Sequence, residues 1–320
     1  MNKNQLAAKI WESANRMRSK IEANDYKDYI LGFIFYKYLS DQEEQWLIHQ
    51  GYDAASIQKY VNEEADDAYS GKSNAQRSLG YFIAYKDLFS TWLDLGADFS
   101  VDHVRTALSS FNRLISPSHK KVFEGIFNTL ETGLSKLGDS TKQQTRAVSD
   151  LIQLIREIPM NGSQDYDVLG YIYEFLLEKF ASNAGKKAGE FYTPHEVSLL
   201  MSEMIAAHLK GRDKIKIYDP TSGSGSLLIN IGKTTAKYIG EKDHIRYYAQ
   251  ELKANTYNLT RMNLVMRGIL PDNILTRNGD TLEEDWPYFD EADPQGTYDP
   301  LYVDAVVSNP PSSQRWDPEG

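Results

Sequence analysis

Hydrophobic positions in the first half of the chain repeat at helical spacing. Residues 5–17 carry an amphipathic pattern, and aromatic and aliphatic side chains recur every three or four positions in residues 26–46. We interpret the second pattern as core packing rather than as a platform for stacking bases. Residues 51–78 are polar, acidic and rich in small residues, and are expected to connect helical parts. Further helices are expected over residues 79–95, 101–114, 121–137, 141–155 and 168–180.

The pattern changes from residue 191 onward, where short aliphatic runs alternate with helical stretches. Strands are expected at residues 214–218, 245–250, 274–278 and 302–308, with helices at residues 197–209, 226–239 and 254–267. Such alternation is typical of βαβ units and a parallel, doubly wound sheet. The fold class is therefore α/β, and we predict an all-α domain over residues 1–165 followed by a Rossmann-like domain over residues 166–320.

Composition excludes several classes of site. The chain has no cysteine, which excludes disulfides, thiolate zinc sites and a cysteine nucleophile. Its six histidines are scattered without an i, i+4 pair, so no metal is expected. No apolar run reaches the roughly 18 residues of a membrane span, and the N-terminus lacks the apolar core of a signal peptide. We expect a cytoplasmic protein.

Net charge limits how this chain can interact with nucleic acid. The formal net charge is −10, and residues 280–314 contain nine acidic side chains without a lysine or arginine. Affinity for duplex DNA comes largely from basic side chains that neutralise phosphates. If DNA is the substrate, another subunit is expected to supply much of the basic surface. An acidic protein that never touches nucleic acid remains an alternative at this point.

Glycines and carboxylates follow the expected strands at ligand-binding positions. The first strand runs into residues 219–226, a turn with Gly223 and Gly225 that opens a helix. The second strand ends at Glu251, where an acid can accept hydrogen bonds from ribose hydroxyls. The third is followed by Asp280, which could accept from an adenine amino group. A tight structural turn alone would also explain the glycines, but successive strand ends with these residues favour a nucleoside ligand.

The sequence around this turn does not match two other kinds of nucleotide-binding loop. A phosphate-binding P-loop and a nicotinamide dinucleotide loop would need glycine at positions where this chain has Leu227 and Leu228.

The fourth expected strand delivers the tetrapeptide Asn309-Pro310-Pro311-Ser312. Consecutive prolines stiffen the loop and remove backbone donors, which leaves exposed carbonyls. If the Asn309 side-chain oxygen and the Pro310 carbonyl accept both N–H bonds of an aromatic amine, its nitrogen becomes more tetrahedral. The lone pair then points at a sulfonium methyl group for in-line transfer. This chemistry requires neither a metal nor a covalent intermediate.

Residues 219–227, 278–282 and 307–311 closely resemble amino-methyltransferases of the N6-adenine type. Residues 189–197 look like the cofactor-binding motif that precedes the first strand in the gamma arrangement of that family. In the helical half, residues 25–31, 39–41 and 167–174 resemble the methylation subunit of type I restriction-modification systems. The resemblance spans nearly the whole chain.

The resemblance implies a class I methyltransferase that moves a methyl group from S-adenosylmethionine to N6 of adenine in a specific DNA sequence. The target adenine must be flipped out of the duplex to be reached. The implied partners are DNA, a specificity subunit that reads it, a second copy of the modification subunit and a restriction (nuclease/translocase) subunit. The implied cofactor contacts are Phe191, Tyr192, Thr193, Pro194, Asp219, Thr221, Gly223, Gly225, Ser226, Glu251 and Asp280, and the implied catalytic residues are Asn309, Pro310, Pro311 and Ser312.

The sequence departs from the family at two places. Ser312 stands where the family has Tyr or Phe to stack on the flipped base, a contact worth roughly 1–3 kcal/mol, so roughly ten- to hundredfold weaker use of substrate is expected. The chain ends at Gly320, soon after the fourth strand, and family sheets continue beyond it. We therefore expect a fragment that binds cofactor poorly, because one sheet edge lacks neighbours.

Two alternative functions remain open from the sequence. One is a catalytically weak or inactive subunit that assembles the complex or clamps DNA, which Ser312, the acidic charge and the early end favour. The other is a methyltransferase for RNA or for protein glutamine, because Asn-Pro-Pro loops also occur in those enzymes.

Overall fold

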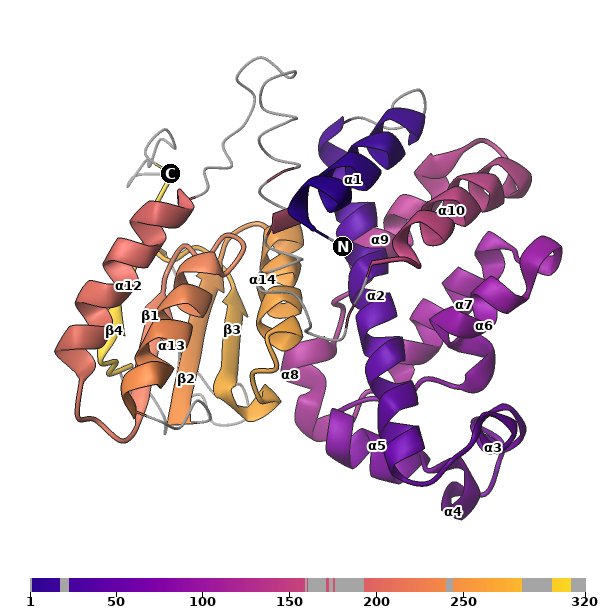
Figure 1. Cartoon of the computed structure of the whole chain (residues 1–320), viewed down its shortest axis with the longest axis horizontal. Helices are drawn as coiled ribbons and strands as arrows, with labels where there is room; N and C mark the ends of the chain where they lie inside the picture. Colours follow the sequence, from indigo (N-terminus) through magenta and orange to yellow (C-terminus); the bar gives the residue numbers. More distant parts are fainter. Residues whose placement is uncertain are drawn as a thin grey trace. The chain divides into compact units, whose positions relative to one another are not determined.

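The computed structural model describes residues 2–17, 23–158, 160, 171–172, 175, 193–239, 244–283 and 301–311. The chain forms two compact units, residues 1–180 and 181–320 (Figure 1). The domain boundary expected after residue 165 lies outside the described residues. Of the helix expected over residues 168–180, only residues 171, 172 and 175 are described, and all of them are helical.

The first unit is helical, as predicted. Within the described residues of the whole chain, no helix is both long and apolar enough to cross a membrane. The helices of the first unit are α1 (Lys3–Met17), α2 (Ala23–His49), α3 (Ala54–Tyr60), α4 (Asp67–Ser70), α5 (Lys72–Leu79), α6 (Phe89–Asp94), α7 (Val101–Arg113), α8 (Lys120–Phe123), α9 (Asn128–Gly133) and α10 (Thr141–Ile155). Short 3₁₀ turns η1 (Tyr85–Asp87), η2 (Gly96–Asp98), η3 (Pro117–His119) and η4 (Leu134–Leu137) join them.

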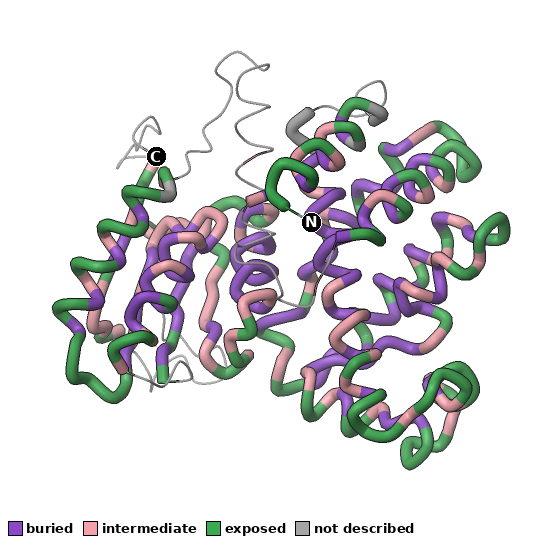
Figure 2. The backbone as a smooth tube through the Cα atoms, in the orientation of Figure 1, coloured by how far each residue is buried: buried purple, intermediate pink, exposed green. Residues whose placement is uncertain are grey.

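Helix α2 is the central element of the first unit's core. Figure 2 shows it buried along much of its length. Its aromatic side chains pack against later segments: the Tyr36 ring stacks on Trp92 of α6 with centroids 4.7 Å apart, and the Phe35 ring lies 5.7 Å from that of Phe127, just before α9. Tyr36 and Phe35 are fully buried. The interpretation of the aromatic stripe as core packing is therefore confirmed.

Polar side chains of α2 hold a buried, irregular segment against the helix. The Ile83 N–H donates to the Glu43 carboxylate at 2.8 Å, and the Phe89 N–H donates to the Ser40 hydroxyl at 2.8 Å. The helix expected over residues 79–95 is therefore wrong over its first part. Long-range acceptors from α2 satisfy backbone donors that a helix would have satisfied locally.

Two further expectations about the first unit are wrong. Residues 51–78 form the short helices α3, α4 and α5 rather than a plain connection, because the side chains of Asp53 and Asp66 cap the first two by accepting backbone N–H bonds. The helix expected over residues 121–137 is broken at Gly125, whose φ of 64° lies in the left-handed region.

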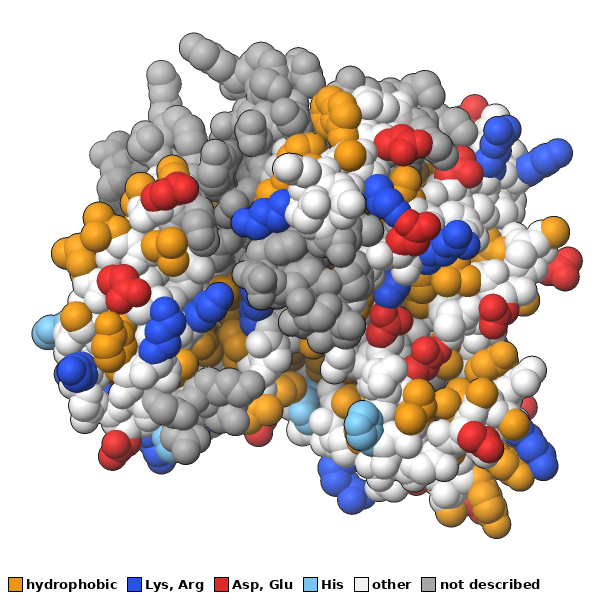
Figure 3. Space-filling view, viewed as in Figure 1, with side chains coloured by type: hydrophobic (Ala, Val, Ile, Leu, Met, Phe, Trp, Pro, Cys, Tyr) orange, Lys and Arg blue, Asp and Glu red, His pale blue; other side chains and the backbone are white. Residues whose placement is uncertain are grey.

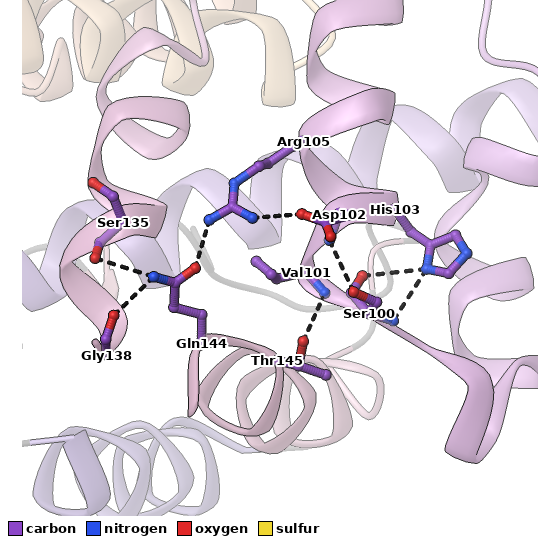
Figure 4. Close-up of polar contacts among 9 residues, drawn as sticks. All are labelled: Ser100, Val101, Asp102, His103, Arg105, Ser135, Gly138, Gln144 and Thr145. Carbon is purple, nitrogen blue, oxygen red and sulfur yellow. Dashed lines mark hydrogen bonds and ion pairs between the residues drawn. The ribbon is translucent and has the colours of Figure 1, made fainter. Parts of the chain in front are cut away.

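A polar cluster ties α7 to α10 and to the turn before α10 (Figure 4). The Arg105 guanidinium donates to the Gln144 side-chain oxygen at 2.5 Å, and the Gln144 amide donates to the Gly138 carbonyl at 2.7 Å. At the start of α7, the Val101 N–H donates to the Thr145 hydroxyl at 3.0 Å. The Val101 N–H and the Gly138 carbonyl lie at helix ends, so two of these bonds satisfy backbone groups that would otherwise lack intrahelical partners.

The described residues of the second unit form a parallel four-stranded sheet with strand order β3-β2-β1-β4. Its strands are β1 (Ile215–Asp219), β2 (Ile245–Glu251), β3 (Ile274–Asn278) and β4 (Ala305–Val306), and every neighbouring pair is parallel. All strands lie where hydrophobic runs predicted them. The fourth is shorter than residues 302–308, because only Ile217 with Ala305 and Tyr218 with Val306 pair across the ladder.

Helices α12 (His195–Leu209), α13 (Ser226–Ile239) and α14 (Ala254–Met266), with the 3₁₀ turn η6 (Pro271–Asn273), alternate with these strands. In Figure 1, α12 and α13 lie in front of the sheet. Gly232 of α13 lets the helix lie close to β2, because a Cβ atom there would collide with the Tyr247 hydroxyl. On α12, Val197, Leu200 and Met204 form an exposed apolar stripe, part of the orange surface in Figure 3.

Candidate active site at the carboxyl edge of the sheet

The strand order brings the predicted site segments to one edge of the sheet. Because all strands are parallel, their carboxyl ends lie at the same edge, with β1 between β2 and β4. The chain leaves β1 towards β2 and later crosses back to place β4 on the other side of β1. In open α/β sheets, ligands bind in the crevice at such a reversal of strand order. The loops after β1 and β4 therefore meet where a ligand is expected.

The loop after β1 adopts its turn through two glycines and is fixed by β2 and α14. Gly223 has a φ of 56° and Gly225 a φ of 79°, a region that L-residues with side chains rarely adopt. The Ser222 N–H donates to the Gln250 carbonyl at 2.9 Å, and the Thr260 hydroxyl donates to the Gly223 carbonyl at 2.6 Å. The loop is thus held in place by contacts with two other elements.

Asp219 ends β1 with a carboxyl group buried beneath this loop. Its Oδ1 accepts the Thr221 N–H at 2.9 Å, which closes the turn. The pKa of Asp219 is raised from 3.8 to about 7, mainly because the group is buried; the nearby Glu251 carboxylate adds to the rise, and the hydrogen bond from Thr221 opposes it. The carboxyl group therefore changes charge near neutral pH.

Half-buried carboxylates stand at the ends of the next two strands. Glu251 accepts the Gly223 N–H at 3.0 Å through one oxygen and the Lys253 N–H at 3.0 Å through the other. Asp280 accepts the Leu282 N–H at 2.9 Å. Backbone donors orient both side chains, and each remains partly accessible to solvent. An ionised carboxylate has about four lone-pair sites, so each group can accept additional hydrogen bonds from a ligand.

The loop after β4 is joined to the rest of the edge through side chains. The Ser308 and Thr221 hydroxyls lie 2.8 Å apart, which links this loop to the glycine loop. The Asn309 side-chain nitrogen donates to the Thr193 hydroxyl at 3.1 Å, although 116 positions separate these residues in the chain. Asn309 is exposed and therefore accessible to a substrate.

Four other predicted site residues lie in or beside the loops of this edge. Pro310 is exposed and Pro311 is half-buried in the same loop. Ser226 begins α13, and its hydroxyl lies 2.7 Å from that of Ser224. Pro194 is exposed at the start of α12. Phe191, Tyr192 and Ser312 lie outside the described residues.

Sequence reasoning did not single out several residues that shape this edge. Ser308 contacts the glycine loop, while Thr260 and Asn263 of α14 bond to its backbone carbonyls. Ser308 could have been suspected because it directly precedes Asn309. Nothing in the local sequence marks Thr260 or Asn263, since their role depends on how α14 packs over a distant loop.

The described residues contain no group of three or more His, Asp or Glu side chains arranged to hold a metal ion. Which of the residues at this edge touch a cofactor stays a prediction from the sequence resemblance.

Comparison with known protein families matches both parts of the chain. A model described as HsdM N-terminal domain matches residues 6–155, and one described as N-6 DNA Methylase matches residues 164–320. Among curated proteins, the MpnII methylase subunit of a type I restriction enzyme from Mycoplasma pneumoniae is 30% identical over 98% of this chain and 59% of its own length. The MjaIX methylase subunit of Methanocaldococcus jannaschii is 26% identical over 96% of this chain and 51% of its own length.

A solved structure supports the same relationship. The type I restriction-modification system methyltransferase subunit from Streptococcus thermophilus superposes with a TM-score of 0.78 at 31% identity, covering 99% of this chain and 65% of that one. The chain therefore belongs to the N-6 DNA methylase family over residues 164–320 and to the HsdM N-terminal domain family over residues 6–155. Over nearly its whole length it is similar to methylase subunits of type I restriction enzymes. The resemblance inferred from the motifs is confirmed, as is the class I methyltransferase fold. The chain spans roughly half to three-fifths of the length of these two curated relatives.

Proposed function

We propose that this chain methylates N6 of adenine in a specific DNA sequence, with S-adenosylmethionine as methyl donor, as the modification subunit of a type I restriction-modification complex. One observation carries the proposal. A contact of 2.8 Å between the Ser308 and Thr221 hydroxyls joins the loop with Asn309 to the glycine loop. The Gly223 N–H of the glycine loop in turn donates to Glu251, the carboxylate at the end of β2. A site for a nucleoside cofactor and a site for an aromatic amine would therefore be adjacent.

The residues of the glycine loop and the strand ends fit S-adenosylmethionine. Gly223 leaves space for close approach, since a Cβ atom there would meet only the Thr221 carbonyl oxygen, at 3.9 Å. Glu251 would accept from ribose hydroxyls and Asp280 from the adenine amino group. When bound, this cofactor supplies an electrophilic methyl group on a sulfonium.

Asn309 and Pro310 would prepare the target amine for transfer. The amide oxygen of Asn309 and the carbonyl of Pro310 would each accept one N–H bond of the amine, which localises its lone pair. The two acceptors would direct this lone pair towards the methyl group that S-adenosylmethionine would supply, and the proton released by the amine would pass to solvent at the exposed Asn309. Rigid acceptors placed before reaction lower the barrier through orientation and electrostatics.

The charge of the chain supports a role within a complex. Its formal net charge of −10 is unfavourable for holding DNA alone, since phosphate contacts depend on lysine and arginine. We propose that a specificity subunit supplies the basic surface and the sequence recognition. A second modification subunit and a restriction subunit complete the proposed assembly.

Methyl transfer from labelled S-adenosylmethionine would test this function. The chain purified with its specificity subunit should label duplex DNA on adenine N6, and Asn309→Ala should abolish labelling while the thermal melting temperature stays unchanged. Label in an RNA or protein fraction instead of DNA would contradict the proposal. Equal labelling by wild type and Asn309→Ala would also contradict it.

Ser312 offers a second test of the same site. If this position faces the flipped base, Ser312→Tyr should raise the methylation rate at low DNA concentration roughly ten- to hundredfold by restoring a stacking contact. A complex that stays inactive with tyrosine at this position would favour a subunit that only assembles the complex or clamps DNA.

A further inference from the structure

The side chain of Asn309 can face a substrate in two ways that differ in chemistry. Its amide carries an acceptor oxygen and a donor nitrogen on the same carbon, and rotation about the last side-chain bond exchanges them. In the structure the nitrogen donates to the Thr193 hydroxyl at 3.1 Å. The oxygen then lies on the other side of the amide and is the atom available to accept an N–H bond.

We propose that Thr193 is a positioning residue that holds the Asn309 side chain in place by this hydrogen bond, which leaves the amide oxygen free to accept from the target amine. This inference rests on the proposed function and assigns Thr193 a role different from the cofactor contact that the sequence resemblance implies. Without this hydrogen bond the amide would rotate about its last side-chain bond, and its oxygen would face the target amine for less of the time.

Thr193 is well placed for this role because helix packing fixes its backbone. It directly precedes Pro194, whose carbonyl accepts the Ser198 N–H at 3.0 Å in the first turn of α12. The Ser198 hydroxyl in turn accepts from the Asn230 side chain of α13 at 2.7 Å. Because α13 starts at the end of the glycine loop, Thr193 is tied to the same framework that would hold the cofactor.

The backbone next to Asn309 is fixed by a separate contact. Ser308 bonds to Thr221 of the glycine loop, so the loop's position does not depend on Thr193. Thr193 also has a branched Cβ, which restricts the rotation of its own side chain. Loss of the Thr193 hydroxyl should therefore free the Asn309 amide without displacing the loop.

The test compares Thr193→Val with Thr193→Ser in the complex with the specificity subunit. Valine keeps the shape of threonine and removes the hydroxyl, whereas serine keeps the hydroxyl. Ser202→Ala serves as the matched control, because it removes a buried hydroxyl from α12, the helix that follows Thr193. Among the described residues, this hydroxyl donates to the Ser198 carbonyl at 2.6 Å.

Thr193→Val should lower kcat for adenine methylation about tenfold, which is the effect of losing one hydrogen bond between the target amine and the Asn309 oxygen in the transition state. KM for DNA and the Kd of S-adenosylmethionine, measured by calorimetry, should stay within about twofold of wild type. Thr193→Ser and Ser202→Ala should keep wild-type kcat. An unchanged kcat in Thr193→Val, or a loss of cofactor affinity that accounts for its reduced activity, would overturn the inference.

A second measurement does not depend on activity. In ¹H–¹⁵N spectra of asparagine-labelled protein, the Asn309 side-chain signals are identified by their disappearance in Asn309→Asp. They should shift and exchange with solvent faster in Thr193→Val, and should stay unchanged in Thr193→Ser and Ser202→Ala. Unchanged signals in Thr193→Val would refute the contact itself. If wild-type protein methylates no DNA, the proposed function fails, and the spectra still decide whether Thr193 holds Asn309.

Discussion

Replacing Asp219 with asparagine should change how the stability of the second unit depends on pH. Asp219 at the end of β1 is 1% exposed, and this burial is the main reason that its pKa is raised from 3.8 to about 7. The folded protein therefore holds this proton more tightly than the unfolded chain does. The stabilisation from the neutral acid is fully present below pH 3.8 and is lost as the pH rises through about 7.

The size of this effect follows from the difference in pKa. A difference of about three pKa units corresponds to about 4 kcal/mol of unfolding free energy over the full range, since one unit is 1.36 kcal/mol. Between pH 5 and pH 8 the wild-type protein should lose about 3 kcal/mol through this group alone. Asparagine keeps the size of the side chain and an oxygen acceptor for the Thr221 N–H, but does not titrate.

Hydrogen exchange of β1 and α13, measured by mass spectrometry from pH 5 to pH 8 and corrected for intrinsic rates, reports the stability of this unit. Protection in the wild type should fall relative to Asp219→Asn as the pH rises. Asp213→Asn, which changes an exposed carboxylate in the same unit, should follow the wild type. Parallel curves for wild type and Asp219→Asn would refute the assigned shift and the burial argument behind it.

Three other substitutions test packing and the proposed cofactor contact. Gly232→Ala places a methyl group against the Tyr247 hydroxyl and should reduce the free energy of unfolding by about 1–3 kcal/mol in urea titrations, with partial recovery when Tyr247→Phe is added. Glu43→Ala leaves the buried Ile83 N–H without its acceptor and should reduce the free energy of unfolding by about 1–3 kcal/mol. Glu43→Gln retains an oxygen acceptor and should be about as stable as the wild type. Burial raises the pKa of Glu43 well above its usual range, so glutamine replaces a side chain that is already uncharged. Glu251→Gln should weaken S-adenosylmethionine binding about tenfold in calorimetry by removing a charge-assisted hydrogen bond.

For each of these three predictions, one result would contradict the reasoning. A fully stable Gly232→Ala protein would mean that α13 and β2 are not closely packed. Equal destabilisation by the alanine and glutamine variants at position 43 would mean that the hydrogen bond to Ile83 is unimportant. Unchanged cofactor affinity in Glu251→Gln would remove this carboxylate from the proposed site.

Elements whose signals are local could be predicted from the sequence. Hydrophobic periodicity placed α13 at residues 226–239 and β3 at residues 274–278, where the structure has them. Strand ends could be recognised because glycines and carboxylates directly follow hydrophobic runs, as at Gly223 and Glu251. Periodicity and turn composition depend on residues close together in the chain, so they can be read without knowing the tertiary structure.

Which distant groups meet depends on how the whole chain folds. The pairing of β4 with β1 puts Asn309 beside Thr193 across 116 positions, and the packing of α14 puts Thr260 on the glycine loop. The same holds for residues 79–95, whose helical pattern is overridden near Ile83 by acceptors on α2. Such contacts depend on which buried donors and acceptors satisfy each other after the chain has folded, and no local pattern encodes that choice.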